Sequence, residues 1–523
     1  MQMSTERAYI MNDNTPILVG SGQYVDRNPV APETSLSPAD MAAEVARRAL
    51  SDAGASGDMA ETVDVLAVAR LFEHSVKDTV MWPNPFGCSN NMPWSVANRI
   101  GVKPARAIYA EVGGETPQRL VNQMAEAIHA GEIRTAVLTG AEALATIRNA
   151  KRAGIELDWN EDVAGEFEDL WPDDPMSSSY ERHHGITFPI QVYALFDQVR
   201  RHEMGLGADA YRKDIGRLFA PFSTVAAANP YAQFPTARSV DEFATYSTQN
   251  FPLCEPYAKW MVAQDAVNQG AAVVMTSVGL ARELGIAQTH WIYLRAYADV
   301  DELPVIERPR LASSAAQGLA LARILDDAAV AIDDIELIDL YSCFPIAVSS
   351  ACEHLGLPTD GSRALTLTGG LPCFGGPGNN YSLHGIAEVV RQLRGKPQGH
   401  ALVAANGGYL SKHSAGIYSR TLEGPWQVRS STAERRQAKA PSEVNVVEAA
   451  AGIATIESYA AVYARGVPSG GFIVGRLAEN QGRFLAVVAP DDDLARALLF
   501  SDEPIGRTVS VQSNDGLNTF TAA

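Results

Sequence analysis

The stretch Gly375–Gly385, GGPGNNYSLHG, places glycines and asparagines in front of a single histidine, His384. A histidine can act as a general acid or base, or donate a hydrogen bond to developing negative charge. The glycines allow the backbone to bend sharply or to approach a ligand closely. The spacing fits neither the dinucleotide motif G-x-G-x-x-G nor the P-loop motif G-x-x-x-x-G-K-[ST]. His384 is therefore a candidate catalytic residue, with a helix-capping role as the alternative.

The cysteines offer one further reactive group. There are five of them (Cys88, Cys254, Cys343, Cys352 and Cys373), and none forms a C-x-x-C pair. This pattern indicates reduced thiols rather than a disulfide framework or a zinc site. Cys343, in LIDLYSCFP, is the candidate nucleophile, and an inert buried thiol is the alternative. His183 and His184 have no acidic or cysteine partner at ligand spacing, so we expect no metal site.

Alternating strand and helix patterns predict the elements that position these residues. Pro16–Tyr24 is typical of a buried strand, and a helix follows with Ser37 as its N-cap. A second amphipathic helix is predicted at about Arg119–His129, and a strand at Thr135–Thr139. Residues 145–249 are acidic and aromatic with weak periodicity, which indicates an insertion containing some helices. The whole pattern favours an α/β architecture.

An internal duplication is the clearest feature of the organisation. RALSDAG is echoed by RILDDAA, and VDVLAV by IELIDL. The helix and strand that end near Leu144 match a second pair that ends near Leu410, at an offset of 266 residues. The period is far too long for a solenoid repeat, so we predict two fused α/β halves.

The pattern changes after about residue 425. Residues 442–520 contain short β-rich runs separated by Gly, Pro, Asn and Asp turns. They predict a small barrel of five or six strands and roughly 80 residues. The charged stretch STAERRQAKAPSE at 431–443 is expected to be an exposed linker, and the tail to fold separately.

Charge and composition exclude several classes of function. The chain has 523 residues and a net charge of -19, which argues against nucleic acid and anionic membranes as partners. It contains no run of 18 apolar residues and no secretory signal pattern, so we expect no membrane span and a cytoplasmic location.

These features together resemble the thiolase superfamily over about residues 15–420. LIDLYSCFP stands where thiolases carry Asn-Glu-Ala-Phe, the stretch before His384 is similar to their glycine–histidine block, and ANGGYL occupies the place of their final Cys-x-Gly block. With its β-rich tail, the chain is most similar to the thiolase-like proteins of type one. The resemblance implies a duplicated thiolase fold, with two βαβαβαββ halves layered α/β/α/β/α, and an OB-like C-terminal barrel. The implied domains are 15–288, with the insertion at about 145–249, then 289–425 and 437–523.

The resemblance also implies roles for individual residues. His384 matches the catalytic histidine, and Tyr341 is similar to the acid/base tyrosine of lipid-transfer-type CoA aldolases. His413 is expected in the loop after the last core strand, near the active site. The nucleophile position falls at Gly114, which has no side chain to acylate. The second catalytic cysteine falls at Ala405 or Asn406. Contacts with the coenzyme A thioester are implied at the glycines of these blocks, namely Gly114, Gly407 and Gly408.

The implied function is an acyl-CoA-acting enzyme of lipid metabolism, of the acetyl-CoA acetyltransferase type. It would form or cleave a carbon–carbon bond without the usual nucleophilic cysteine. Its substrate would be a coenzyme A thioester, with no tightly bound cofactor. The alternatives are a CoA-dependent aldolase or lyase, a non-catalytic acyl-CoA or lipid carrier, and a scaffold subunit. Both a homodimer and a monomer remain open.

Overall fold

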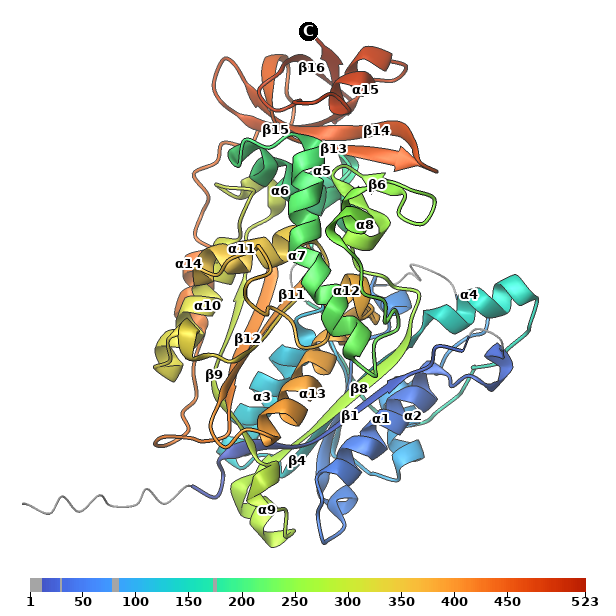
Figure 1. Ribbon diagram of the computed structural model, residues 1–523, viewed down its shortest axis with the longest axis vertical. Helices are drawn as coiled ribbons and strands as arrows, with labels where there is room; N and C mark the ends of the chain where they lie inside the picture. Colours follow the sequence, from blue (N-terminus) through green and yellow to red (C-terminus); the bar gives the residue numbers. More distant parts are fainter. Residues whose placement is uncertain (1–11, 29–30, 78–83, 173–175) are drawn as a thin grey trace, which may run out of the picture.

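The computed structural model describes residues 12–28, 31–77, 84–172 and 176–523, and a ten-stranded sheet forms its centre (Figure 1). The order of the strands is β10-β11-β12-β9-β1-β8-β4-β2-β3-β5. The strands of the first half are β1 (Pro16–Val25), β2 (Val63–Val68), β3 (Arg106–Tyr109), β4 (Thr135–Ala143), β5 (Glu168–Asp169) and β8 (Asn268–Ser277). Those of the second half are β9 (Ile292–Asp301), β10 (Leu337–Leu340), β11 (His400–Gly407) and β12 (Lys412–Ser419).

The two halves share one topology, which confirms the predicted duplication. Reading outward from the middle, β1-β8-β4-β2 in the first half corresponds to β9-β12-β11-β10 in the second. In each half, the first two of these pairings are antiparallel and the third is parallel. The halves join at a short seam, where Ile17 pairs with Tyr293 and Leu18 with Ile292. The ten strands are therefore two half-sheets joined edge to edge.

Two central helices lie between the half-sheets. They are α3 (Thr116–Ala130) and α13 (Tyr381–Arg394), which run side by side and pack on strands of both halves (Figure 1). The outer faces are covered by α1 (Pro38–Asp52) and α2 (Met92–Ile100) in the first half, and by α10 (Ala315–Ala328) and α11 (Pro345–Leu355) in the second. These are the layers of the duplicated thiolase fold.

Local signals in the sequence set the ends of the helices. The Ser37 side chain accepts a hydrogen bond from the backbone N–H of Asp40, and Pro38 occupies the first turn of α1. Gly131 ends α3 with a φ of 74°, a left-handed conformation that glycine adopts without steric cost. The predicted helices and strands of the first half are confirmed, with α3 beginning three residues earlier than expected.

The insertion in the first half is mostly helical. Its helices are α4 (Leu144–Ala153), α5 (Ser179–His183), α6 (Pro189–Glu203), α7 (Ala208–Ala228) and α8 (Val240–Ala244), and the short strands β6 (Pro252–Cys254) and β7 (Tyr257–Ala258) follow them. After it, α9 (Val278–Glu283) follows β8, and the short helix α12 (Gly370–Cys373) precedes α13. The insertion is tied to the second half through buried Asp197, which accepts hydrogen bonds from the Tyr211 and Tyr257 hydroxyls and from the backbone N–H of Ile346.

The C-terminal region is a closed five-stranded barrel, as predicted. Its elements are β13 (Gly452–Ala464), β14 (Val467–Leu477), β15 (Arg483–Val488), α15 (Asp493–Leu499), β16 (Thr508–Asn514) and β17 (Leu517–Ala522). The order β14-β15-β17-β16-β13 closes through a β13–β14 pairing. The stretch 431–443 is not a featureless linker, because α14 (Thr432–Ala438) packs on α10 and β9.

The barrel is docked on the core rather than tethered to it. Strand β13 pairs antiparallel with β6 of the core, with Val462 opposite Cys254. The fully buried guanidinium of Arg483 donates to the backbone carbonyls of Ile306 and Arg308 and pairs with Glu457. None of the helices in the described part of the chain combines the length and the apolar character that a membrane span requires.

Candidate active site

The two halves meet at Gly114, the position implied for the nucleophile. Gly114 lies between β3 and α3, and Tyr341 directly follows β10. A Cβ added to Gly114 would overlap the Tyr341 hydroxyl oxygen and would lie 2.7 Å from the Asn406 carbonyl oxygen. The backbone at Gly114 therefore has no room for a side chain, and the Tyr341 hydroxyl fills the space that one would occupy.

Residues before and within α13 hold the backbone at Gly114. The Gly113 N–H donates to Asn379 Oδ1 at 3.0 Å, and Ser382 Oγ donates to the Gly114 carbonyl at 2.5 Å. Asn379 Nδ2 in turn donates to the Arg70 carbonyl at 2.9 Å. The asparagines of the glycine-rich loop are thus structural donors and acceptors, a role that the sequence analysis missed.

Glu115 is a second residue that the sequence analysis missed. It is fully buried, and neither of its carboxyl oxygens has a hydrogen-bond partner in the described part of the chain. A Cβ added to Gly407 would overlap Glu115 Oε2, so crowding by Glu115 is sufficient to require a glycine at this position. Burial raises the pKa of Glu115, although the charges of Lys412 and Arg119 lower it. The only signal in the sequence is a carboxylate next to the implied nucleophile position.

Cys343 lies on the other side of this cluster. Asn406 Nδ2 donates to the Tyr193 hydroxyl at 2.8 Å and lies 3.6 Å from Cys343 Sγ. Tyr193, which comes from α6 of the insertion, stacks on Phe344 with ring centroids 4.3 Å apart. Burial raises the pKa of the Cys343 thiol to about 12, so the thiol is protonated at neutral pH and is a weak nucleophile.

His384 faces away from Gly114. His384 does not cap a helix, because α13 begins three residues before it, at Tyr381. An α-helix has 3.6 residues per turn, so two positions along it rotate the side-chain direction by about 200°. His384 therefore lies on nearly the opposite face of α13 from Ser382, which hydrogen bonds to Gly114. The imidazole is fully buried, donates from Nδ1 to Gln23 Oε1 at 2.8 Å, and packs its edge on Phe374.

Burial also sets the charge of His384. It lowers the pKa of the imidazole to about 3, so the ring is neutral at physiological pH. Its Nε2 atom has no hydrogen-bond partner among the described residues. The structure thus gives His384 a packed, uncharged environment within α13, and no hydrogen bond joins it to Tyr341 or Cys343 in the described residues.

The position of His413 also differs from expectation. His413 is not in a loop but in β12, paired with Asn406 of β11. Its Nε2 hydrogen bonds to Ser314 Oγ at 2.9 Å, and burial lowers its pKa to about 4. Gly408 adopts a φ of 60° in the turn between these strands, where a Cβ would overlap Ser411 Oγ. His413 therefore has a structural partner in Ser314, and a contact of Gly408 with the thioester stays a prediction.

Two cavities of the described structure lie elsewhere. One of about 160 Å³ is lined by Arg27 and Arg148, and one of about 320 Å³ is lined by His74 and Cys88. Neither is lined by Gly114, Tyr341 or Cys343. The candidate active site is therefore identified from the convergence of its functional groups.

Comparison with known proteins identifies the family. The model of the thiolase-like protein type 1 additional C-terminal domain matches residues 436–516. A monomeric SCP2-thiolase-like protein type 1 from Mycobacterium smegmatis is 37% identical, and its crystal structure superposes with a TM-score of 0.83. That match covers 98% of this chain and 100% of the other. The chain belongs to the SCP2-thiolase-like proteins of type 1.

More distant relatives of this SCP2-thiolase-like chain share its fold. The Ltp2-ChsH2(DUF35) aldolase is 20% identical with a TM-score of 0.55, and the match covers 77% of this chain and 97% of the other. An acetyl-CoA acetyltransferase from Syntrophomonas wolfei is 15% identical with a TM-score of 0.55, over 78% of this chain and 100% of the other. No curated protein sequence matches the chain. The thiolase-like fold is thus common to transferases and an aldolase.

Proposed function

We propose that this protein acts on acyl-CoA thioesters and makes or breaks a carbon–carbon bond without a covalent acyl-enzyme. The observation that carries the proposal is the Tyr341 hydroxyl, which fills the space of a side chain at Gly114. A proton donor thus stands where the family's nucleophile would be, and nothing at Gly114 can be acylated. An aldol or retro-aldol step suits this arrangement, because it needs a partner for the oxyanion and a proton donor but no nucleophile.

Tyr341 is suited to the role of proton donor. Burial raises its pKa well above the ordinary value, so the hydroxyl keeps its proton at neutral pH. It makes no hydrogen bond within the described residues, which leaves it free to donate to a ligand. A thioester oxygen that becomes negatively charged would accept this hydrogen bond, and the enolate carbon would afterwards take up a proton.

Glu115 is the second acid/base group of the proposal. Its charge contributes to raising the pKa of Tyr341, so the two groups interact electrostatically. In a retro-aldol step, the β-hydroxyl of the substrate loses its proton, the bond between the α- and β-carbons breaks, and the enolate carbon is protonated. Glu115 can hold the proton in the interval, since burial raises its pKa. The step is redox-neutral and needs no further reactant.

Transfer of the acetyl-CoA acetyltransferase type is the alternative, and it needs another nucleophile. Cys343 is the remaining candidate nucleophile. Its sulfur lies beside Asn406, and Asn406 is one of the two positions implied for the second catalytic cysteine. A thiol pKa of about 12 disfavours this route at neutral pH. The proposal therefore places Cys343 among the packing residues.

Product analysis tests the proposal. The full chain would be incubated with a panel of 3-hydroxyacyl-CoA and 3-ketoacyl-CoA thioesters, and products and intact protein mass would be followed by mass spectrometry. We expect cleavage of a 3-hydroxyacyl-CoA and no acyl adduct. Tyr341→Phe should lower turnover about 100-fold, the typical cost of removing an oxyanion donor.

Tyr409→Phe is the matched control, since that hydroxyl donates to the Thr187 carbonyl. It should turn over like the wild type. A stoichiometric acyl group on Cys343 would replace the proposal with the acyltransferase alternative. Tight binding of acyl-CoA without turnover of any thioester would instead support a carrier.

A further inference from the structure

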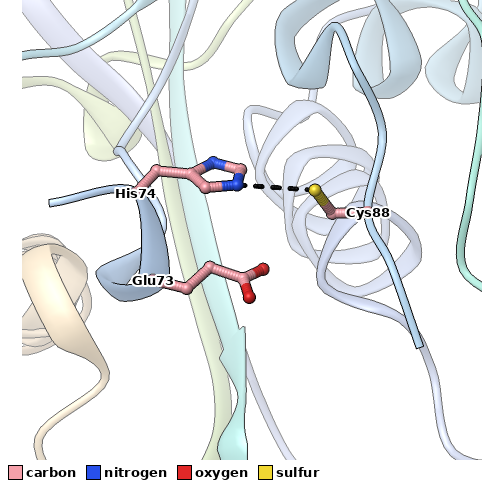
Figure 2. Close-up of side chains that lie close together, drawn as sticks. All are labelled: Glu73, His74 and Cys88. Carbon is pink, nitrogen blue, oxygen red and sulfur yellow. Dashed lines mark hydrogen bonds between the residues drawn. The ribbon is translucent and has the colours of Figure 1, made fainter. Parts of the chain in front are cut away.

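Three potential metal ligands converge in the first half, away from Gly114. Glu73 and His74 lie in a short 3-10 helix after β2 (Phe72–His74), and Cys88 lies in the segment before α2. Figure 2 shows the Cys88 sulfur and the His74 ring facing each other, with the Glu73 carboxylate beside them. One ligand atom from each residue lies within 4.8 Å of the other two.

The geometry of His74 resembles that of a metal ligand. Its Nε2 lies 3.4 Å from Cys88 Sγ, and its Nδ1 hydrogen bonds to the Tyr109 hydroxyl at 2.8 Å. In a tetrahedral zinc site, bonds of about 2.3 Å to sulfur and 2.0 Å to nitrogen place these two atoms about 3.5 Å apart. A ligating histidine also uses its other nitrogen to bind an oxygen that fixes the ring. Tyr109 occupies that supporting position.

Glu73 supplies a buried negative group that lacks a cation. Its side chain is 6% exposed, and no ion pair reaches it within the described residues. Its hydrogen-bond partner is Asn84, a neutral residue. A bound cation would compensate the charge that burial penalises.

A cavity adjoins this cluster. It has a volume of about 320 Å³, and both His74 and Cys88 line it. Arg70 also lines it, stacked on Tyr109 and Trp171 with its guanidinium 4.3 and 4.1 Å from the two ring centroids. A metal held by three side chains would have its fourth position open to this space, as in zinc sites that keep a water or a ligand.

We propose that Glu73, His74 and Cys88 form a three-ligand site for a divalent cation of the zinc class. The thiolate and imidazole ligands exclude magnesium and calcium, which prefer sites made of oxygen ligands alone. The sequence analysis expected no metal site, because no C-x-x-C pair or regular histidine spacing marks it. The adjacent Glu73 and His74 and the distant Cys88 come together only in the fold.

The site is connected to the candidate active site through Asn379. Asn379 Nδ2 donates to the Arg70 carbonyl and to Ser75 Oγ, which flank the ligand-bearing 3-10 helix. Asn379 Oδ1 accepts the Gly113 N–H. A metal ion would therefore fix the segment 70–75, which is hydrogen bonded through Asn379 to the backbone of Gly113. The metal proposal itself does not depend on the reaction proposed above.

Cobalt titration tests the site directly. The full-length protein would be stripped with a chelator and titrated with Co²⁺ under reducing conditions, with absorption spectra recorded. We expect one equivalent of Co²⁺ to give a thiolate charge-transfer band and the intense visible bands of tetrahedral coordination, and Zn²⁺ to displace it. Binding should strengthen as the pH rises, because the Cys88 proton must leave.

Variants identify the ligands. Cys88→Ser should abolish the charge-transfer band, whereas Cys343→Ser, the control at the other half-buried cysteine, should retain it. Tyr109→Phe should weaken Co²⁺ binding about tenfold, as expected for a supporting partner. Glu73→Gln should also weaken binding, with folding checked by circular dichroism. Absence of the band in the wild type, or its persistence in Cys88→Ser, would overturn the proposal.

Discussion

The Gly113 N–H donates to Asn379 Oδ1 at 3.0 Å, and the two residues are 266 positions apart. This separation equals the offset that aligns the two halves of the sequence, so equivalent positions of the duplication touch each other. The contact lies where α3 and α13 begin, next to Gly114 and Ser382. The candidate site is thus built where the two halves meet, and both halves are needed to form it.

Adding a side chain at Gly114 should destabilise the fold. A Cβ there overlaps the Tyr341 hydroxyl, so we expect Gly114→Ala to lower the free energy of unfolding by about 1–3 kcal/mol. Tyr341→Ala in the same chain should recover part of this loss, which a double-mutant cycle in urea would measure. Gly376→Ala is the control, because its Cβ would have ordinary contacts of 3.4 Å or more. Equal stability of Gly114→Ala and wild type would show that Tyr341 does not fill this space.

The buried imidazole of His384 should make stability depend on pH. Its folded pKa of about 3 lies below the ordinary value of 6.5, so below pH 6.5 the unfolded chain binds a proton that the folded chain does not. The contribution of neutral His384 to the free energy of unfolding is therefore fully present above pH 6.5 and is lost as the pH falls towards 3. His384→Gln should show a shallower decline in the free energy of unfolding over this range, measured by denaturant titration at several pH values. Parallel curves for variant and wild type would contradict the burial of a neutral imidazole.

The sequence predicts the framework of this site better than its contacts. Apolar periodicity and the repeated segments around Leu144 and Leu410 identify the two halves, because burial imposes the same pattern on both. The close contact between Gly114 and Tyr341 is made by residues of different halves, and no local pattern in the sequence predicts it. The polar residues before His384 are typical of a loop, and this pattern favours a helix cap at the histidine. The helix instead begins at Tyr381, which turns the imidazole to another face.

The docking of the barrel also escapes local patterns. The sequence predicts its strands as short β-rich runs. The interface, however, depends on single buried groups such as Arg483, and nothing in the local sequence distinguishes this arginine from an exposed one. The helix α14 within the charged stretch 431–443 is another example, since its polar sequence is typical of an exposed segment. Long-range partners decide both outcomes.

Removing the buried arginine should weaken the attachment of the barrel. Arg483→Ala leaves Glu457 without its closest partner and leaves the Ile306 carbonyl unpaired, so we expect a loss of about 3–5 kcal/mol of stability. Limited proteolysis should then cut between the core and the barrel faster than in the wild type. Arg496→Ala is the control in the same barrel, because its pair with Asp493 is largely exposed and should be worth well under about 1 kcal/mol. Unchanged proteolysis of Arg483→Ala would mean that the β13–β6 pairing suffices for docking.

Glu115 should separate stability from activity. Burial raises the folded pKa of Glu115 above its unfolded value, so the folded chain binds the proton more tightly. The stability that this proton contributes is fully present below the unfolded pKa and is lost as the pH rises from there through the folded pKa. Glu115→Gln keeps the volume and removes the ionisable group, so its free energy of unfolding at pH 7 should equal or exceed that of the wild type. If Glu115 holds the proton in the reaction, turnover of the active thioester should fall about 100-fold in the same variant. Glu132→Gln, at an exposed glutamate in the same half, controls for the loss of one charge and should change neither quantity. Full turnover in Glu115→Gln would remove this residue from the mechanism, and a large loss of stability would show that its carboxylate has partners that this structure lacks.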